Sequence, residues 1–114
     1  MRLPGGDDVE IDERKLVDYA LSPAHPVGKF KARLFELKLG LGRDDAPTLI
    51  NALRQAAAEG SAVAGDRDEW GARHRIDFLF RFGDRSAIIT SSWIVPSRGG
   101  RPRLTSVFIA REQR

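Results

Sequence analysis

The hydrophobic period of the chain changes once, near Gly60. Before that glycine, apolar residues recur every three or four positions, which is the spacing of one helix face. After it, Ile76, Phe78, Phe80 and Phe82 occupy every second position, as in a half-buried strand. Helices followed by consecutive strands are typical of an α+β domain. We therefore expect three N-terminal helices packed on one face of an antiparallel meander sheet of three to four strands.

The first and third of these helices have clear boundaries. Asp12 can cap the first, which Ser22 and Pro23 then stop. Asp44 or Asp45 can cap the third, with Pro47 in its first turn and Gly60 after its last residue. Its expected inner face consists of Leu49, Ile50 and Leu53.

The second helix is expected to begin at Lys29 and to stop at Gly40 and Gly42. Its apolar residues form a stripe along the helix, with Lys31 and Lys38 turned away from most of that stripe. The stripe consists of Phe30, Leu34, Leu37 and Leu41, joined by Phe35 and Leu39.

The second half predicts strands joined by short turns. The alternating strand ends at Phe82, and Gly83-Asp84 is a hairpin turn. Further strands are expected over 86–95 and 103–110, with 62–64 as a short edge strand before a polar loop at 65–71. The whole of 1–114 is expected to form one domain, with 1–10 as a flexible or edge segment.

Composition excludes several kinds of chemistry. The chain of 114 residues has no cysteine, so it has no disulfide, thiolate nucleophile or cysteine-based metal site. Its two histidines stand far apart in sequence, and we assign no metal and no cofactor. No apolar stretch is long enough to span a membrane, so no membrane partner is expected. A cytoplasmic location is expected for a cysteine-free chain of this kind.

Positive charge gathers in the second half, where ten basic side chains meet six acidic ones and every basic residue is arginine. Arginine suits phosphate and carboxylate oxygens, so a polyanion partner such as RNA is favoured over a merely solvated face. Strand hydroxyls among these arginines could bind phosphate or a ribose. The candidate substrate-binding residues are Lys29, Arg73, Arg75, Ser92 and Arg101.

Two histidines are candidates for proton transfer. His25 lies in a rigid loop, Pro23-Ala24-His25-Pro26, just before a helix start that carries Lys29 and Lys31. Such a start can hold a phosphate, beside which a histidine could give or take a proton. The plainer alternative is a turn histidine bonded to a carbonyl group. His74 lies at an alternate position with Ile76 and Phe78, so it is expected on the apolar face of that strand. A histidine there usually has a structural role.

Several segments resemble one bacterial domain family. The run from Leu16 to Gly28, with Lys31-Ala32 and Phe35, is similar to its YxLNPxHPxGxxKAxxF signature. Trp70-Gly71-Ala72-Arg73-His74 resembles its YGxxY step, and the later Ser-Trp-Ile-Val and Pro-Arg-Leu-Thr strings resemble its AWI and PRLxT strands. The chain departs from the pattern at Ser22, usually Asn, and at Lys29, usually a small residue. The resemblance covers about residues 11–109.

Members of that family stand alone or form the C-terminal domains of contact-dependent inhibition and other polymorphic toxins. The resemblance implies a metal-independent ribonuclease, acting on transfer RNA, with a layout like that of the barnase, EndoU, colicin and RelE group. It also implies a cognate inhibitor or immunity-type protein as a partner.

The leading hypothesis is therefore cleavage of RNA through attack by the ribose 2'-OH. His25 would be the general base or acid, and Lys31 and Arg103 would stabilise charge on the phosphate. Thr105 and His74 are further catalytic candidates, His74 as the complementary acid. Two alternatives stay open: a non-enzymatic module that binds an acidic protein, and an RNA-binding domain that does not cleave.

Overall fold

The computed structural model describes residues 1–22, 24–26 and 28–110. Short helical turns, α1 (Glu13–Lys15) and η1 (Leu16–Ala20), precede the helix α2 (Lys29–Leu39). A turn, η2 (Arg43–Asp45), leads into the helix α3 (Ala46–Glu59). The strands that follow are β1 (Ala62–Asp68), β2 (Gly71–Phe82), β3 (Arg85–Pro96) and β4 (Arg103–Ile109). The described residues thus combine helices with an open antiparallel sheet of four strands in the order β1-β2-β3-β4.

The expectation of three N-terminal helices is wrong for the first of them. Asp12 does cap a helical turn, since its Oδ1 accepts from the Arg14 N–H at 3.0 Å. The α-helix ends after three residues and gives way to a wider π turn, in which the Leu21 N–H donates to the Leu16 carbonyl at 2.7 Å. The wider turn lines up residues five apart, so Leu16 and Leu21 are both fully buried. Pro23, the predicted stop, lies outside the described residues.

Only part of the predicted apolar stripe of α2 is buried. Ala32, Phe35 and Leu39 face the core, whereas Phe30, Leu34 and Leu37 are exposed. Leu41 is buried, but it follows the helix, which Gly40 ends in a left-handed conformation. The helix carries two apolar rows, and periodicity alone does not say which one the sheet receives.

Helix α3 follows the sequence prediction closely. It has Pro47 in its first turn, buries Leu49 and Leu53, packs Ile50 partly against the core and stops at Gly60. Asp45 does not cap it through its side chain, because that carboxylate accepts from the Gly42 N–H at 2.9 Å.

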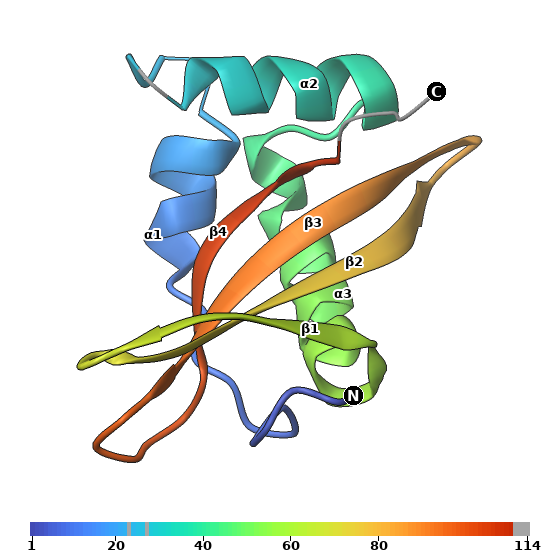
Figure 1. The fold of residues 1–114 in the computed structure, drawn as a ribbon. Coiled ribbons are helices and arrows are strands. Elements are labelled where there is room, and N and C mark those ends of the chain that lie inside the picture. Colours follow the sequence, from blue (N-terminus) through green and yellow to red (C-terminus); the bar gives the residue numbers. More distant parts are fainter. Residues whose placement is uncertain (23, 27, 111–114) are drawn as a thin grey trace.

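The strands form a simple meander. Phe82 pairs with Arg85, which confirms the two-residue turn at Gly83-Asp84. The edge strand β1 is longer than predicted, because it continues past an irregularity into the expected polar loop at 65–71, where Arg67 and Asp68 pair with β2. Figure 1 shows α3 behind the sheet, α1 beside β4, and α2 across one end. The core centres on the fully buried Trp93. The other large, fully buried side chains include Phe35, Leu16, Leu21, Leu39, Leu41, Leu49, Leu53, Ile76, Ile89 and Leu104.

The first ten residues are joined to the far end of the chain. Leu3 and Val9 are buried, and Glu10 forms a parallel bridge with Arg103. The Glu10 N–H donates to the Pro102 carbonyl at 2.8 Å, and the Leu104 N–H donates to the Glu10 carbonyl at 3.0 Å. This segment therefore partly pairs the outer edge of β4.

Candidate functional site

A pocket of about 330 Å³ lies where η1, α2 and β4 meet. Leu16, Ala20, Leu104 and Val107 make its apolar walls. Its polar lining comes from two lysines and two hydroxyls, Lys15, Lys31, Thr105 and Ser106. Because the η1 turn buries Leu16 and Ala20, it places Lys15 at the pocket and holds the walls in place.

Lys31 is the half-buried cation of this pocket. It projects from the first turn of α2, and its Nζ lies 5.5 Å from the centroid of the Phe108 ring on β4. Desolvation by burial lowers the pKa of the Lys31 ammonium from its usual value of 10.5. A lysine so placed is less completely hydrated than a surface lysine and interacts more strongly with a negatively charged group.

The two hydroxyls stand at an irregularity in the sheet. The β3–β4 register shifts between Ser92 and Trp93, opposite Thr105. The Thr105 hydroxyl donates to the Ser92 carbonyl at 3.1 Å, which supports the bulge. With its proton committed to that carbonyl, the Thr105 oxygen can accept from a ligand or a cation.

His25 precedes α2 and is not among the residues that line the pocket. Its Nδ1 accepts from the Gly28 N–H at 2.9 Å, so the side chain caps the start of the helix. A neutral ring bonded in this way carries its proton on Nε2, from which it can donate but not accept. His25 is thus tied to the start of α2 through its side chain. Val27, within the same loop, lies outside the described residues.

His74 is buried on the face of β2 that also carries Ile76 and Phe80. Its Nδ1 has no hydrogen-bond partner among the described residues. Its strand partners are Ala64 and Trp93, and it does not line the pocket. The structure therefore separates it from Lys31 and Thr105.

Of the candidate arginines, three lie beside carboxylates. Arg73 contacts Asp68 at 2.6 Å, Arg75 lies 3.6 Å from Asp77, and Arg101 lies 3.4 Å from Asp8. These pairs reduce the positive potential that the arginine count suggests. Arg103 is exposed at the start of β4, two residues before Thr105, and Lys29 lies over the ring of Phe30 at 5.3 Å.

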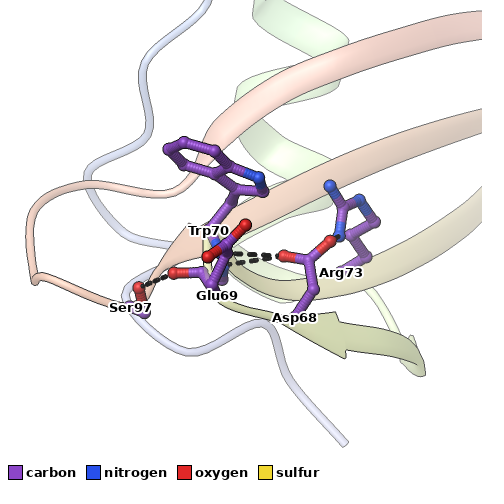
Figure 2. A network of polar contacts seen from close by, with 6 residues as sticks. Asp68, Glu69, Trp70, Arg73 and Ser97 are labelled. Atoms are coloured by element: carbon purple, nitrogen blue, oxygen red, sulfur yellow. Dashed lines mark hydrogen bonds and ion pairs between the residues drawn. The ribbon is translucent and has the colours of Figure 1, made fainter.

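The β1–β2 turn holds Trp70 in an exposed position (Figure 2). Asp68 Oδ1 accepts from the backbone N–H groups of Trp70 and Gly71 at 2.9 and 3.3 Å. The hydrogen bond from Arg73 is the main reason that the pKa of the Asp68 carboxyl lies below its usual value, with help from the Trp70 N–H. Ser97 joins this turn to the β3–β4 loop through the Glu69 carbonyl at 2.6 Å. The turn thus presents an aromatic ring on a well-braced backbone.

The structure brings together two predicted residues, Lys31 and Thr105, and adds two that sequence reasoning missed. Lys15 gave no signal, because an isolated lysine in a short helical turn looks like any surface residue. Ser106 is one of several strand hydroxyls, and nothing in its spacing singles it out. No group of three or more His, Asp and Glu side chains within the described residues could hold a metal ion. No helix in that part of the chain is long and apolar enough to cross a membrane.

Helices packed against an open antiparallel meander, with a lysine-lined pocket at the last strand, define a small α+β domain. The chain belongs to the family described as domain of unknown function (DUF6883), whose model matches residues 2–111. A search of curated proteins finds no match.

The same fold occurs in a solved "Contact-dependent growth inhibition toxin - immunity protein complex from Klebsiella pneumoniae 342". One chain of that complex superposes with a TM-score of 0.67 at 16% sequence identity. The match covers 88% of this chain and 98% of that one. At this identity the likeness concerns the fold.

Proposed function

We propose that this chain is a toxin-like ribonuclease domain that cleaves RNA, with transfer RNA as its substrate, without a metal ion. The observation that carries the proposal is the half-buried Lys31, held with Lys15 and two hydroxyls in one pocket. The family resemblance read from the sequence and the fold shared with a chain of a toxin–immunity complex support it.

In the proposed reaction the ribose 2'-oxygen attacks the adjacent phosphorus. A P–O2' bond forms, the P–O5' bond breaks, and the products are a 2',3'-cyclic phosphate and a 5'-hydroxyl. The proton lost by the 2'-OH passes to solvent or a base, and the leaving 5'-oxygen gains one. No oxidant, reductant or metal is needed, because the phosphorus keeps its oxidation state.

Lys31 would stabilise the negative charge that grows on the phosphate, with Arg103 and Lys15 at the rim. In a phosphoryl transfer without a metal ion, positioned cations in a partly desolvated pocket stabilise the charge of the transition state. Thr105 would orient the nucleotide by accepting a hydrogen bond. His25 would act through Nε2, as a donor to a phosphate oxygen or to the leaving oxygen, when RNA extends from the pocket toward the start of α2. His74 has no part in this scheme because it is buried elsewhere.

The test is incubation of the purified protein with total transfer RNA in EDTA, with fragments resolved on a denaturing gel. Lys31→Ala should slow cleavage by roughly 100-fold, the loss typical when one preorganised charge-stabilising group is removed. The matched control is Lys38→Ala, on the same helix but outside the pocket, which should retain activity. Undiminished cleavage by Lys31→Ala would reject the assignment. RNA that is bound but recovered intact would favour the non-cleaving alternative.

The pH profile provides a second check on Lys31. Its lowered pKa means that the ammonium loses its proton at a lower pH than a free lysine does. Cleavage should therefore fall on the alkaline side before pH 10.5, the ordinary lysine value. Lys31→Arg should keep activity to higher pH, since arginine stays charged. An alkaline limb unchanged by that substitution would place its cause in another group.

A further inference from the structure

The outer side of α2 carries an unusual row of large apolar side chains, here called the α2 ridge: Phe30, Leu34 and Leu37. They are 64%, 40% and 67% exposed. Their spacing of four and three residues places them on one helix face. The opposite face of the same helix, with Phe35 and Leu39, is already buried against the sheet.

Single exposed leucines are ordinary on a protein surface, but an aligned row on one helix is typical of a binding surface. The ridge faces away from the sheet, because the side of α2 that contacts β3 and β4 is the other one. Figure 1 shows α2 lying across the end of the molecule, with no element of the fold above it in that view. These three side chains therefore remain largely open to solvent.

The charges around the ridge indicate what would cover it. Lys29 and Arg33 flank one side, and Lys31 and Lys38 flank the other, whereas Glu36 is the only acidic residue of α2. The Lys29 ammonium already lies over the Phe30 ring, which places positive charge beside the row. A complementary surface would thus combine apolar groups with carboxylates.

A second copy of this chain fits the ridge poorly. A two-fold contact would pack α2 against α2 and bring the lysines and arginines of both copies together. Like charges across an interface cost several kcal/mol. An acidic partner gains from the same charges.

We propose that the α2 ridge is a docking site for an acidic protein, which presents apolar side chains flanked by Asp and Glu to Phe30, Leu34 and Leu37. The helix supplies three anchors at the spacing used when a helix lies in a groove. The basic flanks supply orientation and fast association. This docking does not depend on RNA cleavage, and either property could hold without the other.

The test uses two synthetic helical peptides of equal length, each with leucines at positions i, i+4 and i+7. One has glutamate on both flanks and the other has lysine there, and binding is followed by fluorescence anisotropy. The full-length wild-type protein should bind the glutamate peptide at least tenfold more tightly than the lysine peptide. Added salt should weaken that binding.

The variant Phe30→Ser/Leu37→Ser should lose at least tenfold in affinity for the glutamate peptide. Circular dichroism and thermal unfolding show whether it stays folded. The control Leu79→Ser, which changes an exposed leucine on β2, should bind like the wild type. Equal affinity for the two peptides, no binding of either, or undiminished binding by the double variant would each overturn the proposal. A dimer in sedimentation that the double variant abolishes would overturn it in favour of self-association.

Discussion

Helices α2 and α3 are neighbours in sequence, yet they use their apolar residues differently. Helix α3 has one apolar face and buries it, with Leu49 and Leu53 inaccessible to solvent. Helix α2 has two, and only the face with Phe35 and Leu39 is buried. Core packing therefore accounts for the apolar residues of α3, but for only one of the two apolar rows of α2. The exposed row, the α2 ridge, does not contribute to the core, and we propose above that it binds a partner.

The largest expected effect concerns the inner faces, where the two helices should behave alike. Phe35→Ala removes a fully buried ring and should lower the free energy of unfolding by about 3–5 kcal/mol. Leu53→Ala in α3 should cost about 2–5 kcal/mol for the same reason. Urea denaturation measures both. A loss below about 1 kcal/mol for Phe35→Ala would show that α2 does not close the core.

The glycines that end the two helices sharpen the contrast. Gly60→Ala should cost about 1–3 kcal/mol, since its Cβ would press on the Ala56 carbonyl and lie 2.9 Å from Ile76 Cγ2. Gly40→Ala should cost about 1–2 kcal/mol because its φ of +69° strains an L side chain, although its Cβ meets only Arg85 at 3.6 Å. Thermal unfolding of the two variants gives the comparison. Gly60→Asn should be no better tolerated than Gly60→Ala, whereas Gly40→Asn should recover part of the loss.

A smaller effect on the free energy of unfolding is expected at the C-terminal ends of the two helices. Arg85 Nη1 donates to the Glu36 and Leu37 carbonyls at 3.5 and 3.4 Å, so a cation from β3 meets the end of α2. The last turn of α3 reads Ala-Ala-Ala-Glu and has no such cation. Arg85→Ala should cost about 0.3–1 kcal/mol, and added salt should shrink that cost. A salt-independent loss in urea denaturation would instead point to lost packing of the arginine stem.

The smallest effect is expected on the ridge. Phe30→Ser and Leu37→Ser should each change the free energy of unfolding by no more than about 0.5 kcal/mol, as exposed substitutions usually do. Leu49→Ser in α3, a buried position, provides the contrast under the same conditions. A loss above about 2 kcal/mol for Leu37→Ser would mean that the ridge is packed within the chain. The two faces of α2 would then not differ in burial.

The sequence predicted those elements whose local pattern is compatible with a single structure. The alternation through Phe78 and Phe80, the turn at Gly83-Asp84 and the boundaries of α3 are all present in the structure. The first helix was wrong because hydrophobic spacing does not distinguish an α turn from a π turn. The stripe predicted for α2 merged two apolar rows, and which row is buried depends on how the helix packs on the sheet.

A candidate-site residue could be predicted only where a reactive or charged side chain also stands at a recognisable place in the sequence pattern, such as a helix start. Lys31 stood out because it lies in the first turns of a helix after a rigid loop. Its approach to Thr105 and Ser106 depends on how β4 packs beside η1, which no local pattern encodes. The role of His25 as a cap depends on one hydrogen bond to Gly28, which spacing alone does not reveal.

The contribution of β4 to the pocket has a consequence for protein synthesis. Residues 104–107 form one wall, and the partner of Glu10 in the parallel bridge is Arg103. Translation delivers α2, α3 and the β2–β3 hairpin before these residues leave the ribosome. A chain released before residue 104 would carry Lys15 and Lys31 without the wall that assembles them. The proposed pocket would therefore be complete only after β4 has been synthesised and has paired with β3.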